Sequence, residues 1–247
     1  MPKRRKFLGQ CFLEDKNILA LEAKLLDPKD KTVLEIGGGD GRLTRAILQQ
    51  KPKKLFVVEK DPRFAAMLRD ISNSAIQVLE GDFLTIQIPE IDLIIGNIPY
   101  YISSEIIFSL PKLHFEKALL MVQKEFAQKM VAKPGDSNYG RLSVTAQIHF
   151  EITLEHIVPN HLFRPVPKVD SAIIMLKPTR TLLSGFEEDI IRFIFQHKNK
   201  NVKNALIHSN FSASTISKLG GLALRRGRTL AKEECLEIAR ILETNPA

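Results

Sequence analysis

The sequence predicts an α/β protein: a Rossmann-like domain with a mostly parallel sheet and an antiparallel edge hairpin, followed by a small all-helical domain. Short β-branched runs alternate with helical stretches from Lys31 to Gln123, a pattern typical of a parallel sheet covered by helices. After Glu187 no strand pattern occurs, and apolar residues recur at helical spacing. We therefore expect an α/β domain over residues 1–180 and a helical domain over residues 181–247.

The parallel part of the sheet is expected to contain five strands, and helices over residues 43–50 and 63–71 connect the first three of them. These five strands cover residues 32–36, 55–59, 76–79, 92–96 and 118–123. Two further strand patterns, at residues 151–158 and 169–176, are separated by a proline-bearing loop without a helix. They therefore predict an antiparallel hairpin at the sheet edge.

The composition excludes several classes of protein. The 247 residues carry 36 basic and 28 acidic side chains, a net charge of +8, and 44% are hydrophobic, which is ordinary for a globular chain. No apolar run approaches the roughly 20 residues that span a bilayer, and no apolar signal core follows the basic N-terminus. Cys11 and Cys235 lie far apart, and neither they nor the histidines show metal-ligand spacing. We expect a cytoplasmic monomer that binds no metal and no membrane.

A glycine-rich turn follows the first strand. Its sequence brings a ligand close to backbone N–H groups at the start of a helix. Gly37, Gly39 and Gly41 form a GxGxG pattern, and Arg42 stands where a dinucleotide fingerprint would need its third glycine. The turn therefore predicts a nucleotide-type cofactor but argues against hydride-transfer chemistry.

Acidic side chains follow the next two strands at the same sheet edge. Glu59, at the end of the second strand, is placed to accept hydrogen bonds from both hydroxyls of a ribose. Asp82, after the third strand, can accept from an adenine amine, and Phe83 can pack near the base. Each feature alone is also explained by ordinary turn packing or a solvated charge. Their order and spacing together predict an S-adenosylmethionine pocket.

The fourth strand leads directly into Asn97-Ile98-Pro99-Tyr100. The exocyclic nitrogen of adenine is a poor nucleophile, so a catalyst must favour its pyramidal, methyl-accepting geometry. The Asn97 side-chain oxygen and the Ile98 carbonyl can accept from its hydrogens, Pro99 fixes the turn, and Tyr100 can stack on the base. No strong general base is required. The alternative interpretation is a structural Asn-x-Pro turn.

The chain as a whole resembles the KsgA-type ribosomal RNA adenine dimethyltransferases, which dimethylate two adjacent adenosines near the 3′ end of small-subunit rRNA. The resemblance rests on seven ordered motifs: FLGQCFL (7–13), EIGGGDG (35–41), EKD (59–61), GDF (81–83), NIPY (97–100), YGRLS (139–143) and FRPVPKVDS (163–171). It implies an S-adenosylmethionine-dependent enzyme with a role in ribosome biogenesis.

The resemblance also implies further site residues. Phe163 would form the second wall of a pocket that receives a flipped adenine opposite Tyr100. An ordinary core phenylalanine remains the alternative at this position. The residues implied to bind the cofactor are Gln10, Cys11, Leu13, Gly37, Gly39, Glu59, Lys60, Asp82, Phe83 and Asn97. Cys11 departs from the family, which usually has Asn or His there, and a thiol is a weak donor.

Basic residues cluster at 3–6, 198–203 and 225–228. Three clusters on a chain of this charge favour contacts with phosphates, which carry little sequence information. We therefore expect small-subunit rRNA within a pre-ribosomal particle as the partner, with the helical domain contacting RNA or the ribosome.

Several other functions remain open at this stage. A large-subunit rRNA adenine methyltransferase of the antibiotic-resistance type shares the same loop and turn, and target RNA would separate the two. A non-catalytic ribosome-assembly factor would keep the fold without turnover, although intact Asn97, Pro99 and Tyr100 argue against it. A DNA adenine methyltransferase is disfavoured because no base-reading domain is evident. The number of methyl groups added to each base is left open by the sequence.

Overall fold

The computed structural model describes residues 11–209 and 211–244. Within them the chain forms two compact units. The first contains the described residues up to Ala127 together with Ile152–Pro178, and the second contains Gln128–Glu151 together with the described residues from Thr179 onward. The break at Pro178 lies close to the expected boundary at residue 180. Residues 128–151, however, belong to the second unit and not to the α/β domain in which the sequence interpretation placed them.

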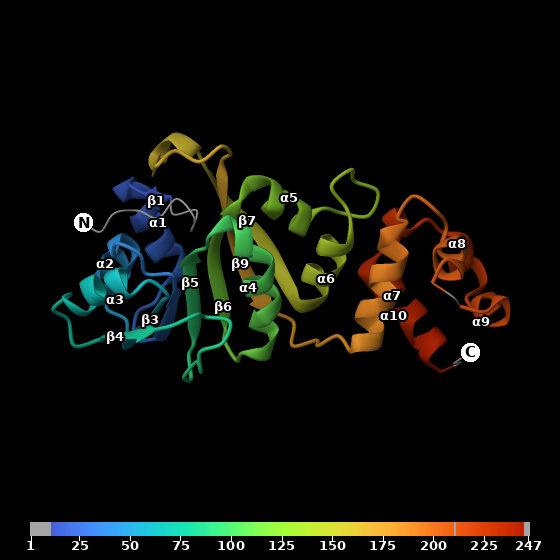
Figure 1. The fold of residues 1–247 in the computed structure, drawn as a ribbon, viewed down its shortest axis with the longest axis horizontal. Helices are drawn as coiled ribbons and strands as arrows, with labels where there is room; N and C mark the ends of the chain where they lie inside the picture. The colour runs from blue at the N-terminus through green and yellow to red at the C-terminus, as the bar shows by residue number, and fades with distance from the viewer. Residues whose placement is uncertain (1–10, 210, 245–247) are drawn as a thin grey trace. The chain divides into compact units, whose positions relative to one another are not determined.

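The first unit is built on a seven-stranded sheet, of which β3, β4, β5 and β6 are labelled in Figure 1, in shades from blue to green. In spatial order the strands are β4 (Ile76–Glu80), β3 (Lys54–Glu59), β2 (Thr32–Ile36), β5 (Leu93–Asn97), β6 (Lys117–Gln123), β9 (Ser171–Pro178) and β7 (Phe150–Val158). The five strands from β4 to β6 are parallel. Their order reverses beside β2, and open α/β sheets bind ligands at such a point.

The edge of the sheet departs from the parallel arrangement, as the sequence predicted. Strand β9 runs antiparallel to β6, with Ala118 opposite Leu176 and Gln123 opposite Ser171. Strand β7 lies beyond β9 at the edge. A separate two-stranded ribbon, β1 (Phe12–Leu13) paired antiparallel with β8 (Phe163–Arg164), was not expected from the sequence. Two-residue strands are too short to leave a period-2 pattern.

Helices connect the strands of the first unit. They are α1 (Lys16–Leu26), α2 (Arg42–Gln49), α3 (Pro62–Arg69), α4 (Ser103–Ser109) and α5 (Lys124–Val131). Helix α5 continues from the first unit into the second, because the first segment of the first unit ends at Ala127. The first unit also contains the short 3₁₀ turns η2 (Tyr100–Ile102), η3 (Leu110–Lys112) and η4 (Asn160–Leu162). Asp15 caps α1 by accepting from the backbone N–H groups of Asn17 and Ile18 at 2.9 Å. Helix α1 packs against α2 and β6, and its residue Glu22 contacts Asn97 at the carboxyl end of β5.

The second unit is helical in its C-terminal part, as predicted. Its elements are α6 (Arg141–His149), α7 (Gly185–Gln196), α8 (Val202–Ile207), α9 (Ala213–Ser217), α10 (Lys232–Glu243), η5 (Gly220–Leu224) and η6 (Gly227–Thr229). Helix α6 joins this unit because its apolar residues Val144 and Ile148 share one core with α7 and α10. The buried Tyr139 hydroxyl also donates to the Leu230 carbonyl at 2.6 Å. Contacts between residues far apart in sequence thus place residues 128–151 in the second unit, although they precede the expected boundary.

In the described part of the chain, no helix combines the length and apolar character needed to cross a membrane.

Candidate active site

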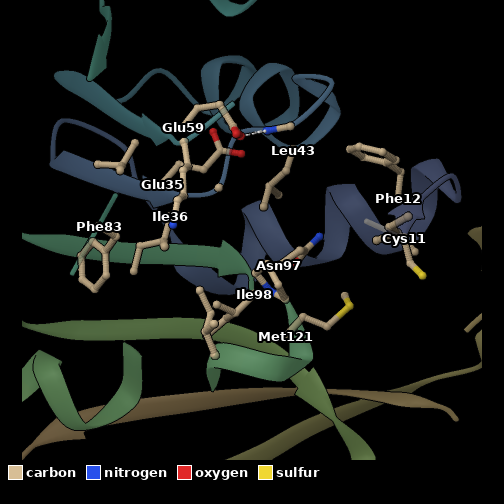
Figure 2. A pocket seen from close by; sticks show the side chains of 18 of the residues that line it. Cys11, Phe12, Glu35, Ile36, Leu43, Glu59, Phe83, Asn97, Ile98 and Met121 are labelled. Atoms are coloured by element: carbon tan, nitrogen blue, oxygen red, sulfur yellow. Dashed lines mark hydrogen bonds between the residues drawn. The ribbon is translucent and has the colours of Figure 1, made fainter. Parts of the chain in front are cut away.

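A pocket lies at the carboxyl ends of β2, β3 and β5, beside the β1–β8 ribbon. It brings together every predicted site residue that the structure describes, and Gln10 lies outside the described residues. The predicted residues that line it are Cys11, Leu13, Gly37, Gly39, Glu59, Lys60, Asp82, Phe83, Asn97, Ile98, Pro99, Tyr100 and Phe163. Figure 2 shows Phe83 at one end of the pocket and Phe12 and Cys11 at the other.

The glycine turn between β2 and α2 provides a cradle of bare backbone. Gly39 has a φ of +50°, and a Cβ built there would lie 2.8 Å from the Phe12 ring. A Cβ at Gly38 would lie 2.4 Å from a Val57 methyl group. Both positions therefore require glycine, one for its left-handed backbone and its neighbour for close packing. The result is a surface on which a ligand can approach backbone N–H groups.

Glu59 ends β3 and connects two structural elements. Its Oε2 accepts from the Gly39 N–H at 2.8 Å, drawn as a dashed line in Figure 2, and its Oε1 accepts from the Asp61 N–H at 2.8 Å. Burial raises the pKa of this carboxyl, and the two backbone N–H donors oppose that shift. Glu59 thus fixes the glycine turn as well as facing the pocket.

Lys60 and Asp82 form an ion pair at the mouth of the pocket. Lys60 Nζ donates to Asp82 Oδ2 at 2.7 Å, and Asp82 Oδ1 accepts from the Leu84 N–H at 3.1 Å. The hydrogen bond from Lys60 lowers the pKa of Asp82, so this carboxyl stays ionised. Phe83 beside it is nearly fully buried and presents its ring to the pocket. In this arrangement Lys60 is better placed to orient the Asp82 carboxylate than to contact a ligand.

The Asn97–Tyr100 loop leaves the end of β5 and is held at both ends. The Ile98 N–H donates to the Met121 carbonyl on β6 at 3.1 Å. The Pro99 carbonyl accepts from the Ile102 N–H at 3.2 Å and from the Ser103 hydroxyl at 3.3 Å. The loop is therefore anchored by hydrogen bonds at both ends, and in Figure 2 Asn97 lies centrally, between Glu35 on one side and Ile98 on the other.

The Tyr100 ring is fixed through its hydroxyl. This oxygen lies 2.7 Å from the hydroxyl of Ser171, the buried first residue of β9. Phe163 also lines the pocket, but it is 3% exposed and packs in the core of the first unit. The structure thus places Phe163 both in the core, which was the alternative interpretation, and at the pocket wall. Its predicted role opposite Tyr100 remains a proposal.

Two buried carboxyl groups beside the site were missed by the sequence prediction. Glu22 on α1 and Glu35 on β2 are both 0% exposed. Burial raises the pKa of each to about 8; the hydrogen bond from Asn97 opposes the shift at Glu22, and the nearby Thr44 side chain opposes it at Glu35. Among the described residues, neither Glu35 oxygen has a hydrogen-bond partner. A buried acceptor without a donor is costly, which is typical of a functional site.

The sequence carried signals for these residues. Glu35 is a charge inside an apolar strand, and Glu22 occupies the apolar stripe of α1 formed by Leu19, Ala23 and Leu26. A charged residue at a core position is unusual in a folded protein unless it has a function. Phe12, which packs edge-on against Phe64 with ring centroids 5.5 Å apart, was inside a recognised motif but was not named as a site residue.

Two of the three predicted basic clusters are adjacent in the second unit, while the cluster at residues 3–6 lies outside the described residues. The Val202 N–H donates to the Arg225 carbonyl at 2.8 Å, and the Arg228 N–H donates to the Lys198 carbonyl at 2.9 Å. Some of these cations have structural roles: Lys198 Nζ donates to the Tyr139 carbonyl at 2.9 Å, and Arg225 pairs with Glu234. The side chains of Lys203, Arg226 and Arg228 are exposed and make no hydrogen bond or ion pair with other residues that the structure describes.

The pocket matches the chemical demands of S-adenosylmethionine. The bare glycine turn and Glu59 suit the ribose, and Asp82 with Phe83 suits the adenine. The Glu35 oxygens, which have no donor among the described residues, can accept hydrogen bonds from the amino group of the methionine end. Together with the sheet order, these features define a class I S-adenosylmethionine-dependent methyltransferase.

Comparison with known proteins gives the family. The family model described as ribosomal RNA adenine dimethylase matches residues 1–244, and the chain belongs to this family. It is therefore an rRNA adenine dimethyltransferase that uses S-adenosylmethionine. A relative from Thermococcus onnurineus, named probable ribosomal RNA small subunit methyltransferase A, is 38% identical over 96% of this chain and 92% of its own length. A relative of the same name from Methanothermobacter thermautotrophicus is 38% identical over 97% and 91%.

Solved structures agree with this assignment. A dimethyladenosine transferase from Plasmodium falciparum superposes with a TM-score of 0.84 at 30% identity, covering 94% of this chain and 98% of that one. The 23S rRNA methyltransferase ErmE has a TM-score of 0.70 at the same identity, covering 94% and 99%. At equal identity and nearly equal coverage, the dimethyladenosine transferase is the more similar structure.

Proposed function

We propose that this chain adds two methyl groups to the exocyclic amino group of each of two adjacent adenosines near the 3′ end of small-subunit rRNA. The observation that carries the proposal is the rigid Asn97–Tyr100 loop beside the cofactor pocket, in which the buried Asn97 Oδ1 has no donor among the described residues. The names of the relatives and the higher similarity to the dimethyladenosine transferase support the small subunit as the source of the target.

In the proposed mechanism the chain's own residues orient the target amine. Asn97 Oδ1 and the Ile98 carbonyl accept from its two hydrogens, which concentrates the nitrogen lone pair toward the methyl donor. The bound S-adenosylmethionine supplies the methyl group. Because the methylated amine is acidic, it loses its proton without a dedicated base, which is consistent with an amide at position 97. The immobile loop keeps both acceptors in place and lowers the entropic cost of alignment.

The target base would be flipped out of its stack and held between Tyr100 and Phe163. The hydrogen bond to Ser171 holds the Tyr100 ring, and core packing holds the Phe163 ring. Two immobilised aromatic walls suit a planar base, and each base–aromatic stack contributes about 1–3 kcal/mol. For the cofactor, we propose that Gly37, Gly39, Glu59, Asp82 and Phe83 surround the nucleoside and that Cys11, Leu13 and Asn97 lie near the methionine end.

The wider context of the reaction is also proposed. The second unit, with Lys203, Arg226 and Arg228 exposed, would contact RNA phosphates, and the shape of a pre-ribosomal particle would supply target selection. We propose that the enzyme acts as a monomer in the cytoplasm, on the particle in preference to free rRNA.

The test compares substrates and a variant in one assay. Wild-type protein and Asn97→Ala are incubated with labelled cofactor and with small-subunit particles, free small-subunit rRNA, or large-subunit particles. Modified positions are mapped by primer extension and by mass spectrometry of nuclease fragments. We expect two adjacent dimethyladenosines in the small-subunit particle, little modification of free rRNA, and loss of product with Asn97→Ala. The exposed variant Glu80→Gln, outside the pocket, serves as the matched control.

Each other outcome contradicts a stated part of the proposal. Methylation confined to large-subunit rRNA would support the resistance-type alternative. Equal methylation of free rRNA and particle would exclude selection by the particle. Binding to the particle without any adenine modification would support a non-catalytic assembly factor.

A further inference from the structure

Glu22 is a charged residue at a position where the fold calls for an apolar one. It lies on the buried stripe of α1, with Leu19 one turn before it and Leu26 one turn after it, and it is 0% exposed. It is not among the residues that line the pocket. Glu22 therefore lies behind the pocket lining, and an apolar side chain would satisfy the packing of α1 at least as well.

The one hydrogen bond described for the Glu22 side chain is to the catalytic loop. Glu22 Oε2 accepts from Asn97 Nδ2 at 3.3 Å. The other oxygen of each side chain, Glu22 Oε1 and Asn97 Oδ1, is buried and has no hydrogen-bond partner among the residues that the structure describes. Two side chains from elements 75 positions apart in sequence thus meet through one bond, and each keeps a free acceptor.

This contact determines which end of the Asn97 amide faces which way. The oxygen and nitrogen ends of an asparagine amide have nearly the same shape, so packing alone does not distinguish them. Glu22 Oε2 is an acceptor whether or not the carboxyl carries a proton, and it therefore favours the NH₂ end. If the amide were reversed, an ionised Glu22 would face the Asn97 oxygen without a hydrogen bond, and a protonated Glu22 would have to turn its O–H toward Asn97 to keep one.

We propose that Glu22 is a positioning residue, which holds the Asn97 amide so that its oxygen is the end offered to the amine of the target base. The proposal rests on the proposed role of Asn97. In the reversed orientation Asn97 would present a donor to an amine that itself needs acceptors, and the alignment described above would fail. Glu22 acts on the reaction through Asn97 alone, without touching the base or the cofactor.

The neighbouring charges are consistent with this interpretation. Glu22 is one of the like charges that raise the pKa of Glu35 on β2, and repulsion of this kind does not explain a carboxyl at position 22. No basic side chain of the described residues forms an ion pair with Glu22. The bond to Asn97 is therefore the contact that distinguishes glutamate from leucine at this position.

Three substitutions separate positioning from structure. Glu22→Leu removes the acceptor but keeps the volume and the helix, and Glu22→Met serves the same purpose if the leucine variant does not fold. Glu22→Gln keeps an acceptor oxygen for Asn97 Nδ2. Leu26→Val, on the same face of α1 and outside the pocket, weakens the helix packing without touching Asn97.

The first readout is kinetic, at saturating cofactor on the small-subunit particle. For Glu22→Leu we expect a kcat at least about 10-fold lower, because misplaced reacting groups cost about this much or more. The cofactor Kd is expected to change less than about 3-fold, and the thermal midpoint to stay equal or rise, since a buried carboxyl has been removed. Glu22→Gln should retain at least about half of the wild-type kcat. Leu26→Val should lower the midpoint and leave kcat unchanged.

The second readout needs no activity. The Asn97 side-chain NH₂ resonances are assigned in ¹⁵N-asparagine-labelled protein by their absence in Asn97→Ala. We expect shifted, resolved signals in wild type and Glu22→Gln, and a change toward solvent-like or exchange-broadened signals in Glu22→Leu. Failure to methylate any rRNA would contradict the proposed function and leave this spectroscopic comparison decisive for Glu22.

Any of the following results would overturn the proposal: a Glu22→Leu or Glu22→Met enzyme with wild-type kcat, a Glu22→Gln enzyme that loses as much as the leucine variant, or Asn97 NH₂ signals that do not respond to Glu22. A drop in kcat matched by an equal drop in cofactor affinity would likewise assign Glu22 to cofactor binding and contradict a role through Asn97.

Discussion

Glu59 Oε2 and the Gly39 N–H are joined by a 2.8 Å hydrogen bond that ties the end of β3 to the glycine turn after β2. The same carboxyl accepts from the Asp61 N–H through its other oxygen. One side chain therefore holds the cradle and the start of α3 together. A ligand that contacts Glu59 therefore also contacts a glycine turn whose conformation Glu59 stabilises.

Glu59→Gln should weaken cofactor binding at least about 10-fold, because an amide offers one acceptor where the structure uses two and turns a donor toward a backbone N–H. The free energy of unfolding should fall by about 1–3 kcal/mol. Isothermal calorimetry and denaturant unfolding measure the two effects. Glu80→Gln is the matched control, since Glu80 is the direct partner of Glu59 in the neighbouring strand but lies outside the pocket. Equal losses in both variants would contradict a specific role for Glu59.

Tyr100→Phe and Ser171→Ala remove the same 2.7 Å hydrogen bond from opposite sides. Because the stacking face remains, each should lower kcat/KM for the RNA particle by less than about 10-fold, and the two losses should be similar. Tyr100→Ala removes the ring and should cost about 5- to 150-fold, the equivalent of one base stack. Steady-state methylation of the particle gives all three values. A loss in Tyr100→Phe as large as in Tyr100→Ala would show that the hydroxyl, and not the ring, matters.

The stability of the protein should depend on pH through Glu22 and Glu35. Burial raises the pKa of both carboxyls to about 8, so the folded state holds their protons more tightly than the unfolded state. The stabilising effect is complete below a pH of about 4.5 and is lost as pH rises toward 8, with a slope of up to about 1.4 kcal/mol per pH unit for each group.

Urea unfolding at half-unit steps from pH 5 to pH 8 measures this slope. In Glu22→Gln and Glu22→Leu, the free energy of unfolding should fall less steeply with pH, by up to about 1.4 kcal/mol per pH unit, because each variant removes the same titrating group. A decline as steep as that of the wild type in both variants would show that Glu22 does not titrate in this range.

The exposed cations of the second unit should control the salt dependence of RNA binding. Replacing Lys203, Arg226 and Arg228 together with glutamine removes three charges and should reduce the slope of log K against log salt by about 2 to 3. Binding to the particle is measured by filter retention at several salt concentrations. The control replaces Lys29, Lys51 and Lys53, three exposed lysines of the first unit, with glutamine. A similar reduction in the control would indicate a general charge effect and not a phosphate-binding surface.

Much of the fold could be predicted because its signals are local. The β-branched runs became β2 to β6, and the motif residues at their carboxyl ends meet in one pocket because parallel strands share that edge. The proline-bearing loop correctly indicated a change of strand direction at β9. These features depend on a few consecutive residues each.

The missed features depend on contacts between distant residues. Helix α6 joins the second unit through a core that includes Tyr139 and residues about 50 to 100 positions later in the chain, which no local period reveals. The β1–β8 ribbon pairs Phe12 and Leu13 with Arg164 and Phe163, about 150 positions later in the chain, and strands this short leave no sequence pattern. Glu22 was visible as a charge in an apolar stripe, but its partner Asn97 could be identified only once α1 was packed beside β5 and β6.

The β1–β8 ribbon has a consequence for how the two substrates communicate. Leu13 from the proposed methionine end and Phe163 from the proposed base wall are register partners, so neither strand can shift without the other. A ligand that orders one strand lowers the entropic cost of ordering its neighbour. Cofactor and target adenine should therefore bind with positive cooperativity, and by thermodynamic linkage each should raise the affinity of the other by the same factor.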